Sequence, residues 1–231
     1  MEPAEPTPEV IAPPPPDDAT LEALLDEHAP LAPAPLCSEV LVFQARDLFA
    51  LWGAAERLVG GTLGPPFWAV PWPAGVAIAR VLLDAPVWAR GKRTLDVGVG
   101  GGVVAIAAAK AGAAHSVGCD VDPWALRVAA IAARRNGVTI DLVLRDLAEA
   151  DPLETPDLIL AADLEYERGQ APLIRARLDA LVATGSQLLA ADAGRSFFSQ
   201  EGLKPVAAFR IPVSKAVEGV AERDARVYCA G

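Results

Sequence analysis

The chain has 231 residues, a formal net charge of −10 at neutral pH and a pI near 4.7. This charge disfavours nucleic acid as a partner, because neutralising phosphates requires a basic face. The mean hydropathy of +0.30 is high, but the longest uncharged run, residues 59–79, contains four prolines that would break a membrane-spanning helix. We therefore expect no contact with nucleic acid or with a membrane. A monomer is also expected.

The cysteines and the N-terminus point to a reducing compartment. The three cysteines are scattered, without C-x-x-C spacing or clustered histidines, which argues against a disulfide framework and against a metal site. The N-terminus carries acidic residues among prolines and lacks the basic and apolar regions of a secretory signal. A cytoplasmic protein is expected.

Composition divides the chain into three parts. Residues 1–17 are proline-rich and acidic, which predicts a tail that is disordered or polyproline-like. An N-terminal extension over 18–63 follows, with a helix from Thr20 to about His28, a strand at 39–43 and a helix at 47–58. The main domain, 64–231, opens with an aromatic, proline-broken loop at 67–73 and a helix at 74–83.

The main domain then alternates strands and helices, which predicts a mainly parallel sheet with helices on both faces. One helix is marked at both ends: Asp122 and Pro123 begin it, and Asn136 and Gly137 end it. Two further strands, separated by a charged loop, form a C-terminal antiparallel hairpin. The fold class is α/β, a Rossmann-like sheet whose seven strands are expected at 93–97, 115–119, 139–144, 157–162, 186–191, 204–212 and 225–229.

A glycine-rich turn follows the first of these strands. Gly98, Gly100 and Gly102 allow positive φ and close approach of a ligand to the backbone, and a helix begins directly after them. A dinucleotide fingerprint would need its last glycine at position 103, which is valine. The spacing therefore disfavours NAD.

Two acids decide the type of ligand. Asp96 lies at the end of the strand before the turn, and Asp120 closes the next apolar segment. An acid suits an ammonium better than a pyrophosphate, so the pattern indicates S-adenosylmethionine, with Asp96 near the methionine amine and Asp120 on the ribose hydroxyls. In the alternative interpretation, Asp96 only caps N–H groups of the loop.

Several motifs together carry a family resemblance. The chain, from about Ala34 to its C-terminus, resembles the bacterial branch of the class I, seven-strand protein-lysine methyltransferases that modify the β-subunit of electron-transfer flavoprotein. The resemblance implies methyl transfer from S-adenosylmethionine to a protein lysine ε-amine. The expected partner is that β-subunit, with a ribosomal protein as the second candidate. The motifs span residues 66–75, 95–102, 120–123, 163–166 and 192–195.

The resemblance also implies roles for individual residues. Asp163 and Tyr166, of the D-x-x-Y segment, border the channel where the amine meets the methyl donor, and Asp163 also faces the cofactor. Trp72 leans against the cofactor, and Asp146 lies where an acceptor for the adenine amine is common. In the alternative interpretation, Asp163 begins a solvated loop, Tyr166 lies at the edge of the core and Asp146 is a turn or N-cap acid. Arg195 matches a family motif without an assigned role.

Three other functions stay open at this point. They are a small-molecule N-methyltransferase of the nicotinamide-like kind, a regulatory protein that binds S-adenosylmethionine without catalysis, and an NAD oxidoreductase.

Overall fold

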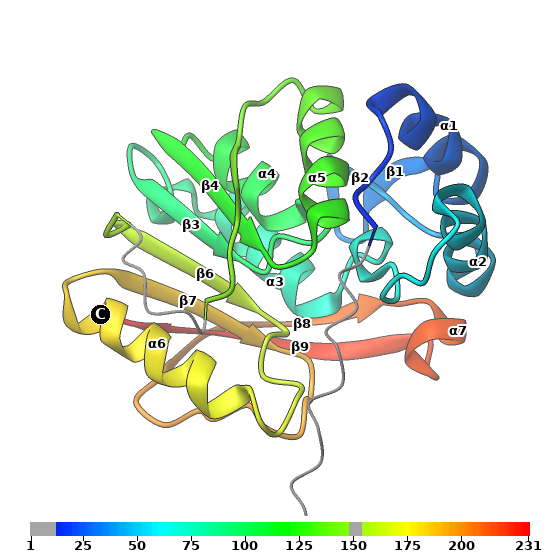
Figure 1. The fold of residues 1–231 in the computed structure, drawn as a ribbon. Helices are drawn as coiled ribbons and strands as arrows, with labels where there is room; N and C mark the ends of the chain where they lie inside the picture. Colours follow the sequence, from blue (N-terminus) through cyan, green and yellow to red (C-terminus); the bar gives the residue numbers. More distant parts are fainter. Residues whose placement is uncertain (1–12, 148–153) are drawn as a thin grey trace, which may run out of the picture.

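The computed structural model describes residues 13–147 and 154–231 (Figure 1). Within these ranges, seven strands form one sheet in the order β5-β4-β3-β6-β7-β9-β8, and β9 runs antiparallel to both of its neighbours. The predicted parallel sheet with a C-terminal antiparallel hairpin is confirmed. The strands are β3 (Arg93–Val97), β4 (His115–Asp120), β5 (Asp141–Leu144), β6 (Leu158–Ala162), β7 (Gln187–Asp192), β8 (Lys204–Pro212) and β9 (Glu222–Ala230).

Alternate residues of the buried strands belong to two apolar cores, one on each face of the sheet. Leu158 and Leu160 of β6 pack into the core beneath α3 (Pro73–Asp84), α4 (Val103–Lys110) and α5 (Pro123–Arg135). Ile159 and Ala161 point to the opposite face, which α6 (Ala171–Ala183) covers (Figure 1). This two-sided burial explains why β6 is an uninterrupted apolar run.

The strand order opens a crevice at one edge of the sheet. From β3 the chain moves outward to β4 and β5, then returns to place β6 on the other side of β3. The loops that follow β3 and β6 therefore leave the sheet in opposite directions. In open α/β sheets, ligands bind at such a switch point, outside the carboxyl ends of the strands.

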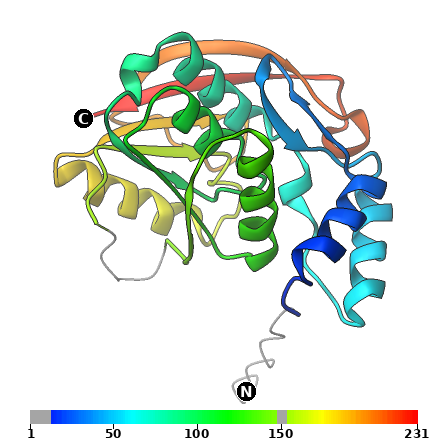
Figure 2. The same cartoon turned by 90° about the horizontal axis from the view of Figure 1, so that it is seen from above.

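The N-terminal extension packs against α5 (Figure 2). It contains α1 (Asp18–His28), the antiparallel pair β1 (Leu31–Ala34) and β2 (Cys37–Phe43), and α2 (Leu48–Val59). The Asn136 side chain, at the end of α5, accepts from the Leu41 N–H at 2.9 Å and donates to its carbonyl at 2.7 Å. Leu21 and Val40 belong to the same core as α3 to α5. The apolar core is therefore continuous across residue 64, and the division there stays a prediction.

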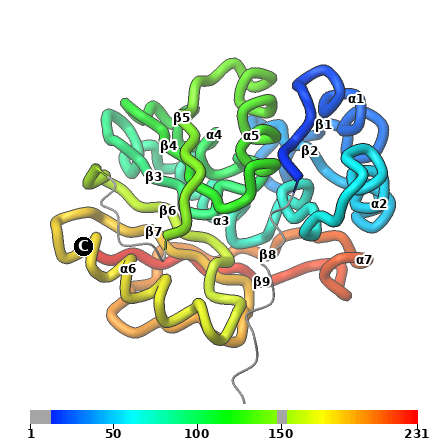
Figure 3. The backbone as a smooth tube through the Cα atoms, viewed as in Figure 1, coloured from blue at the N-terminus to red at the C-terminus, as the bar shows by residue number. Residues whose placement is uncertain are grey.

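The described chain begins within the predicted tail. Residues 1–12 of that tail lie outside the described residues. In the rest, the Pro13 carbonyl accepts from the Trp124 indole N–H at 3.0 Å, and the Asp17 side chain accepts from the Thr20 N–H at 2.9 Å. Figure 3 shows the backbone of this segment, in dark blue, leading into α1. These bonds involve the two ends of the segment 13–17, and the Asp17 cap begins the helix at Asp18, two residues before the expected start.

Other elements also differ from the sequence-based expectation. The strand β1 was not predicted, and the charged loop contains a short helix, α7 (Lys215–Glu218). β9 begins at Glu222 rather than at 225, because its polar first residues pair with β8. Short 3-10 turns lie at Phe67–Ala69 and Pro86–Trp88.

None of the helices in the described ranges has the length and apolar character needed to cross a bilayer.

Candidate functional site

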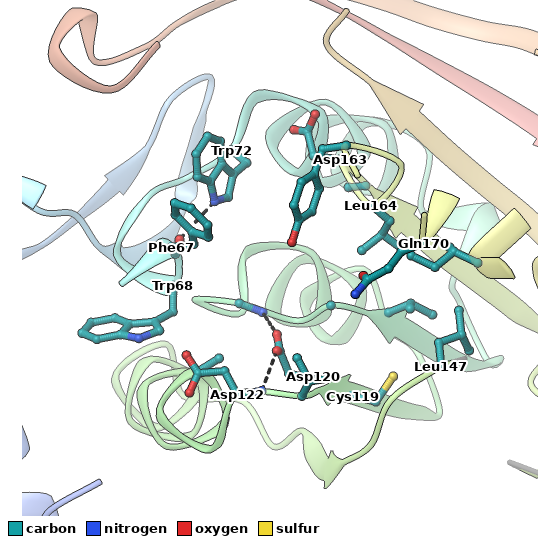
Figure 4. Close-up of a pocket in the computed structure, with 18 of the residues that line it drawn as sticks. Phe67, Trp68, Trp72, Cys119, Asp120, Asp122, Leu147, Asp163, Leu164 and Gln170 are labelled. Atoms are coloured by element: carbon teal, nitrogen blue, oxygen red, sulfur yellow. Dashed lines mark hydrogen bonds between the residues drawn. The ribbon is translucent and has the colours of Figure 1, made fainter. Parts of the chain in front are cut away.

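A cavity of about 470 Å³ lies at the carboxyl ends of β3, β4, β5, β6 and β7 (Figure 4). Each strand contributes residues at or shortly after its carboxyl end, and the 65–72 segment closes one side. Of the nine residues predicted for the site, seven line this cavity: Trp72, Gly98, Gly100, Asp120, Asp146, Asp163 and Tyr166. Asp96 and Gly102 lie outside the wall.

The glycine loop adopts the predicted left-handed geometry. Gly98, Gly100 and Gly102 have φ of 69°, 50° and 88°, values that residues with a Cβ rarely adopt. The N–H groups of Gly98 and Val99 both donate to the Cys119 carbonyl, at 2.8 and 2.9 Å, which ties the loop to the end of β4. Gly102 serves packing instead, since a Cβ there would stand 3.3 Å from the Ala129 Cβ.

Gly101 is a loop residue that the motif analysis did not single out. A Cβ at this position would stand 2.4 Å from the Trp68 carbonyl oxygen. The loop is therefore pressed against the 67–69 turn, and only glycine fits between them. No local pattern signals this, because the contact joins segments more than 30 residues apart.

Asp120 is fixed by the backbone around it. One carboxylate oxygen accepts from the Gly100 N–H at 2.9 Å and the other from the Asp122 N–H at 3.0 Å (Figure 4). Burial raises the pKa of this carboxyl, and the two N–H donors oppose the rise. Each oxygen keeps a further lone pair, so Asp120 can accept from ligand hydroxyls at the cavity wall.

Asp96 lies beneath the loop. Its carboxylate accepts from the Ala105 N–H, in the first turn of α4, at 3.0 Å. The residue is 3% exposed and is not part of the cavity wall. This geometry matches the alternative interpretation, in which the acid caps N–H groups. Direct contact with a ligand amine stays an untested prediction that the position does not favour.

The burial of Asp96 makes stability depend on pH. Desolvation raises its pKa from 3.8 to about 8, the Ala105 N–H opposes the rise, and Asp120 adds to it. The folded state therefore holds a proton that the unfolded chain releases above its ordinary pKa. The resulting contribution to stability is complete below pH 3.8 and disappears as the pH rises through about 8.

We expect the free energy of unfolding of the parent, relative to Asp96→Asn, to fall as the pH rises between about 5 and 9. Urea denaturation of both proteins across this range measures the difference, in which the contributions of other carboxyls cancel. Parallel pH profiles for the two proteins would contradict the assignment.

Asp163 lies on the wall opposite Asp120, at the end of β6. Its φ of 52° is unusual for a residue with a side chain. One carboxylate oxygen accepts from the Ala74 N–H at 3.0 Å, and the other from the Arg195 Nε at 3.0 Å. Burial raises the pKa of this carboxyl, while Arg195 lowers it. With its side chain 7% exposed, Asp163 does not fit the alternative of a solvated loop start.

The remaining predicted residues surround the same space. Trp72 donates its indole N–H to the Phe67 carbonyl at 3.0 Å and faces Asp163 across the wall (Figure 4). Tyr166 is 51% exposed, at the mouth rather than at the edge of the core, and partial burial raises the pKa of its hydroxyl. Asp146 lines the far side, after β5.

Gln170, just before α6, lines the cavity although the sequence analysis did not consider it. A glutamine in a loop carries no pattern that would single it out. Among the described residues, no group of three or more histidines, cysteines or acids is placed to hold a metal ion.

Known proteins share this architecture. A putative RNA methyltransferase from Pyrococcus horikoshii superposes with a TM-score of 0.54 at 13% identity, over 73% of this chain and 89% of that one. Magnesium protoporphyrin IX methyltransferase from Synechocystis, with bound SAM, gives 0.51 at 17% identity, over 68% and 79%. The strand order and the cavity after β3 therefore define a class I methyltransferase fold.

Sequence comparison is more specific. Residues 81–164 match the family model of ribosomal protein L11 methyltransferase. The electron transfer flavoprotein beta subunit lysine methyltransferase of Xenopus laevis is 30% identical over 210 residues, covering 87% of this chain and 83% of the relative. The chain belongs to the family of electron transfer flavoprotein beta subunit lysine methyltransferases. The Danio rerio relative is 35% identical over 158 residues, and there the match spans 64% of this chain and 60% of the relative.

Proposed function

We propose that this chain transfers a methyl group from S-adenosylmethionine to a lysine ε-amine of a protein, with the β-subunit of electron-transfer flavoprotein as the acceptor. The observation that carries the proposal is a cavity with a glycine loop and Asp120 on one wall and Asp163 and Tyr166 on the other, in a chain of this family.

The donors of the loop argue for a cofactor without phosphate. In a dinucleotide site, the loop N–H groups and the start of the following helix bind the pyrophosphate. Here the Gly100 N–H already donates to Asp120, and the Ala105 N–H donates to Asp96. These two N–H donors already have side-chain acceptors and are not free for a phosphate, which disfavours the NAD alternative. The Asp120 carboxylate at the cavity wall suits a cationic nucleoside.

The cavity fits S-adenosylmethionine in size and chemistry. Its volume of about 470 Å³ lies within the range of small-molecule sites. We assign the ribose hydroxyls to Asp120, the adenine amine to Asp146, close backbone approach to Gly98 and Gly100, and the methionine end to the side of Trp72. When bound, the cofactor supplies a methyl group made electrophilic by its sulfonium.

The opposite wall is suited to receive an amine. A lysine must lose its proton before transfer, at a cost of about 4–5 kcal/mol at neutral pH. Partial desolvation in the cavity lowers the pKa of the amine and reduces that cost. We propose that Asp163 and Tyr166 border the amine, since oriented polar groups are needed here more than a strong base. Asp163, held by Ala74 and Arg195, is a fixed acceptor.

One observation favours a second acceptor. The match to the ribosomal protein L11 methyltransferase model covers the glycine loop and both acids, Asp96 and Asp120. A ribosomal protein is therefore the alternative substrate. The bacterial branch, the cytoplasmic location and the monomeric state stay predictions.

The test is methyl transfer from labelled cofactor. We expect label on lysine of the purified flavoprotein β-subunit, located by mass spectrometry, and none when the enzyme is omitted. If only ribosomal protein L11 is labelled, that protein rather than the flavoprotein β-subunit is the acceptor. Turnover of free nicotinamide without any labelled protein would support the small-molecule alternative. Binding of S-adenosylhomocysteine without a methylated product from any extract would support the regulatory alternative.

A further inference from the structure

Arg195 connects the cavity to the C-terminal hairpin. It follows β7 in a tight turn, where the Asp192 carboxylate accepts from the N–H groups of Gly194 at 2.7 Å and of Arg195 at 3.1 Å. Gly194 has φ of 89°, a conformation that glycine adopts without strain. The backbone of Arg195 is therefore set by local bonds, independently of what its side chain contacts.

The Arg195 side chain makes three contacts in three directions. Nε donates to Asp163 at 3.0 Å, and a terminal nitrogen donates to Glu218 of α7 at 3.0 Å. The guanidinium carbon lies 5.3 Å from the centre of the Trp72 ring, within the range of a cation–π interaction. Trp72, Asp163 and Arg195 all line the cavity. One cation therefore joins two wall residues to an element outside the wall.

These contacts stabilise an arrangement that is costly without them. The side chains of Asp163 and Glu218 are 7% and 3% exposed, and a buried carboxylate without a cation is strongly unfavourable. Asp163 also holds a left-handed backbone conformation, which persists only when the surroundings enforce it. Arg195 supplies the cation for Asp163, shares Glu218 with Arg223, and fixes the direction in which Asp163 points.

Resting on the proposed function, we propose that Arg195 is the positioning residue of the acceptor side of the cavity. Its guanidinium holds the Asp163 carboxylate and the Trp72 indole as one unit and anchors that unit to α7 through Glu218. Arg195 acts through these neighbours, so its loss should disturb the acceptor wall more than the ribose wall around Asp120.

The charge of Asp163 gives this role a measurable signature. The charged groups that face Asp163 and its cation are Asp192 of β7, Glu218 of α7 and Arg223 of β9. Arg195 provides the attraction that opposes the effect of burial on Asp163. Without it, the pKa of Asp163 rises, and the ionised form is present only at higher pH. The acid limb of the pH profile of kcat/KM should then move to higher pH.

The experiment compares three variants. Arg195→Gln removes the cation, Arg195→Lys keeps it, and Arg223→Gln is the matched control. Arg223 also donates to Glu218, at 2.8 Å, but does not line the cavity. Each variant is measured for methyl transfer to the flavoprotein β-subunit across pH, for calorimetric binding of S-adenosylhomocysteine, and for its melting temperature.

We expect Arg195→Gln to lower kcat/KM about 30-fold or more and to move its acid limb up by about one pH unit. Arg195→Lys should recover much of the lost kcat/KM and much of the shift in the acid limb. If Arg195→Gln does not fold, the comparison of Arg195→Lys with the parent tests the proposal. Binding of S-adenosylhomocysteine should weaken about fivefold in Arg195→Gln, because Trp72 loses its cation. Arg223→Gln should stay within about threefold of the parent in kcat/KM, with an unchanged pH profile.

If Arg195→Gln and Arg223→Gln lose kcat/KM equally and the acid limb does not move, the positioning role is overturned. Arg195 would then only stabilise the fold. If the parent methylates no lysine, the proposed function fails instead. The calorimetric titration still tests Arg195 in that case, and equal affinities of the parent and Arg195→Gln would overturn the inference.

Discussion

Asp120→Ala is expected to weaken the binding of S-adenosylhomocysteine by about a hundredfold or more. Hydrogen bonds to a charged acceptor contribute about 1.5–3 kcal/mol each, and the assigned ribose offers two hydroxyls. The variant also leaves the N–H groups of Gly100 and Asp122 without their acceptor, which loosens the loop. Isothermal titration calorimetry with S-adenosylhomocysteine measures the effect directly.

The matched control for Asp120→Ala is Asp47→Ala. Asp47 caps α2, where its carboxylate accepts from the Phe49 and Ala50 N–H groups, and it does not line the cavity. Its loss should cost about 1 kcal/mol of stability and leave the affinity unchanged. If Asp120→Ala folds and binds as tightly as Asp47→Ala, Asp120 does not hold the ribose and the cofactor assignment loses its main support.

Gly101→Ala is expected to destabilise the protein and to distort the loop. The added Cβ would meet the Trp68 carbonyl oxygen at 2.4 Å, and because this atom belongs to the backbone, the loop or the 67–69 turn must shift. Overpacking of this kind costs about 1–3 kcal/mol. Misplacement of the loop should also weaken S-adenosylhomocysteine binding about tenfold or more, since small displacements in a site have large effects.

Gly64→Ala is the control for Gly101→Ala. Gly64 has open space around its missing Cβ, and its φ lies outside the left-handed region. The same chemical change there should be neutral or stabilise the protein by up to about 1 kcal/mol, through the unfolded chain. Thermal melting and titration of both variants separate the steric effect from the general cost of replacing glycine. Similar behaviour of the two would show that the loop has room to move.

The sequence predicted those parts of the fold that local pattern determines. The apolar run of β6, the Asp122 cap of α5 and the left-handed glycines at 98, 100 and 102 each have a local physical cause, and the structure places them as expected. The resemblance added the family, which the comparisons confirm.

Features that depend on distant contacts were missed. Gly101 is constrained by Trp68, and Pro13 bonds to Trp124, 111 residues away. The position of Asp96 is a further example. Its place at the end of a strand suggested a ligand contact, but whether a carboxylate faces a cavity or the next helix is set by packing of the loop over it.

The stack between Trp68 and Trp124 has a consequence for how the protein can be divided. The two rings lie 6.2 Å apart and nearly parallel. Trp68 supports Gly101 from one side, while Trp124 is bonded to Pro13. The wall of the cavity thus rests on a segment that precedes every strand of the main sheet. A shortened version that keeps only the sheet and its helices would lose the bond from Trp124 to Pro13, so a residue far before the main sheet contributes to the support of the cavity wall.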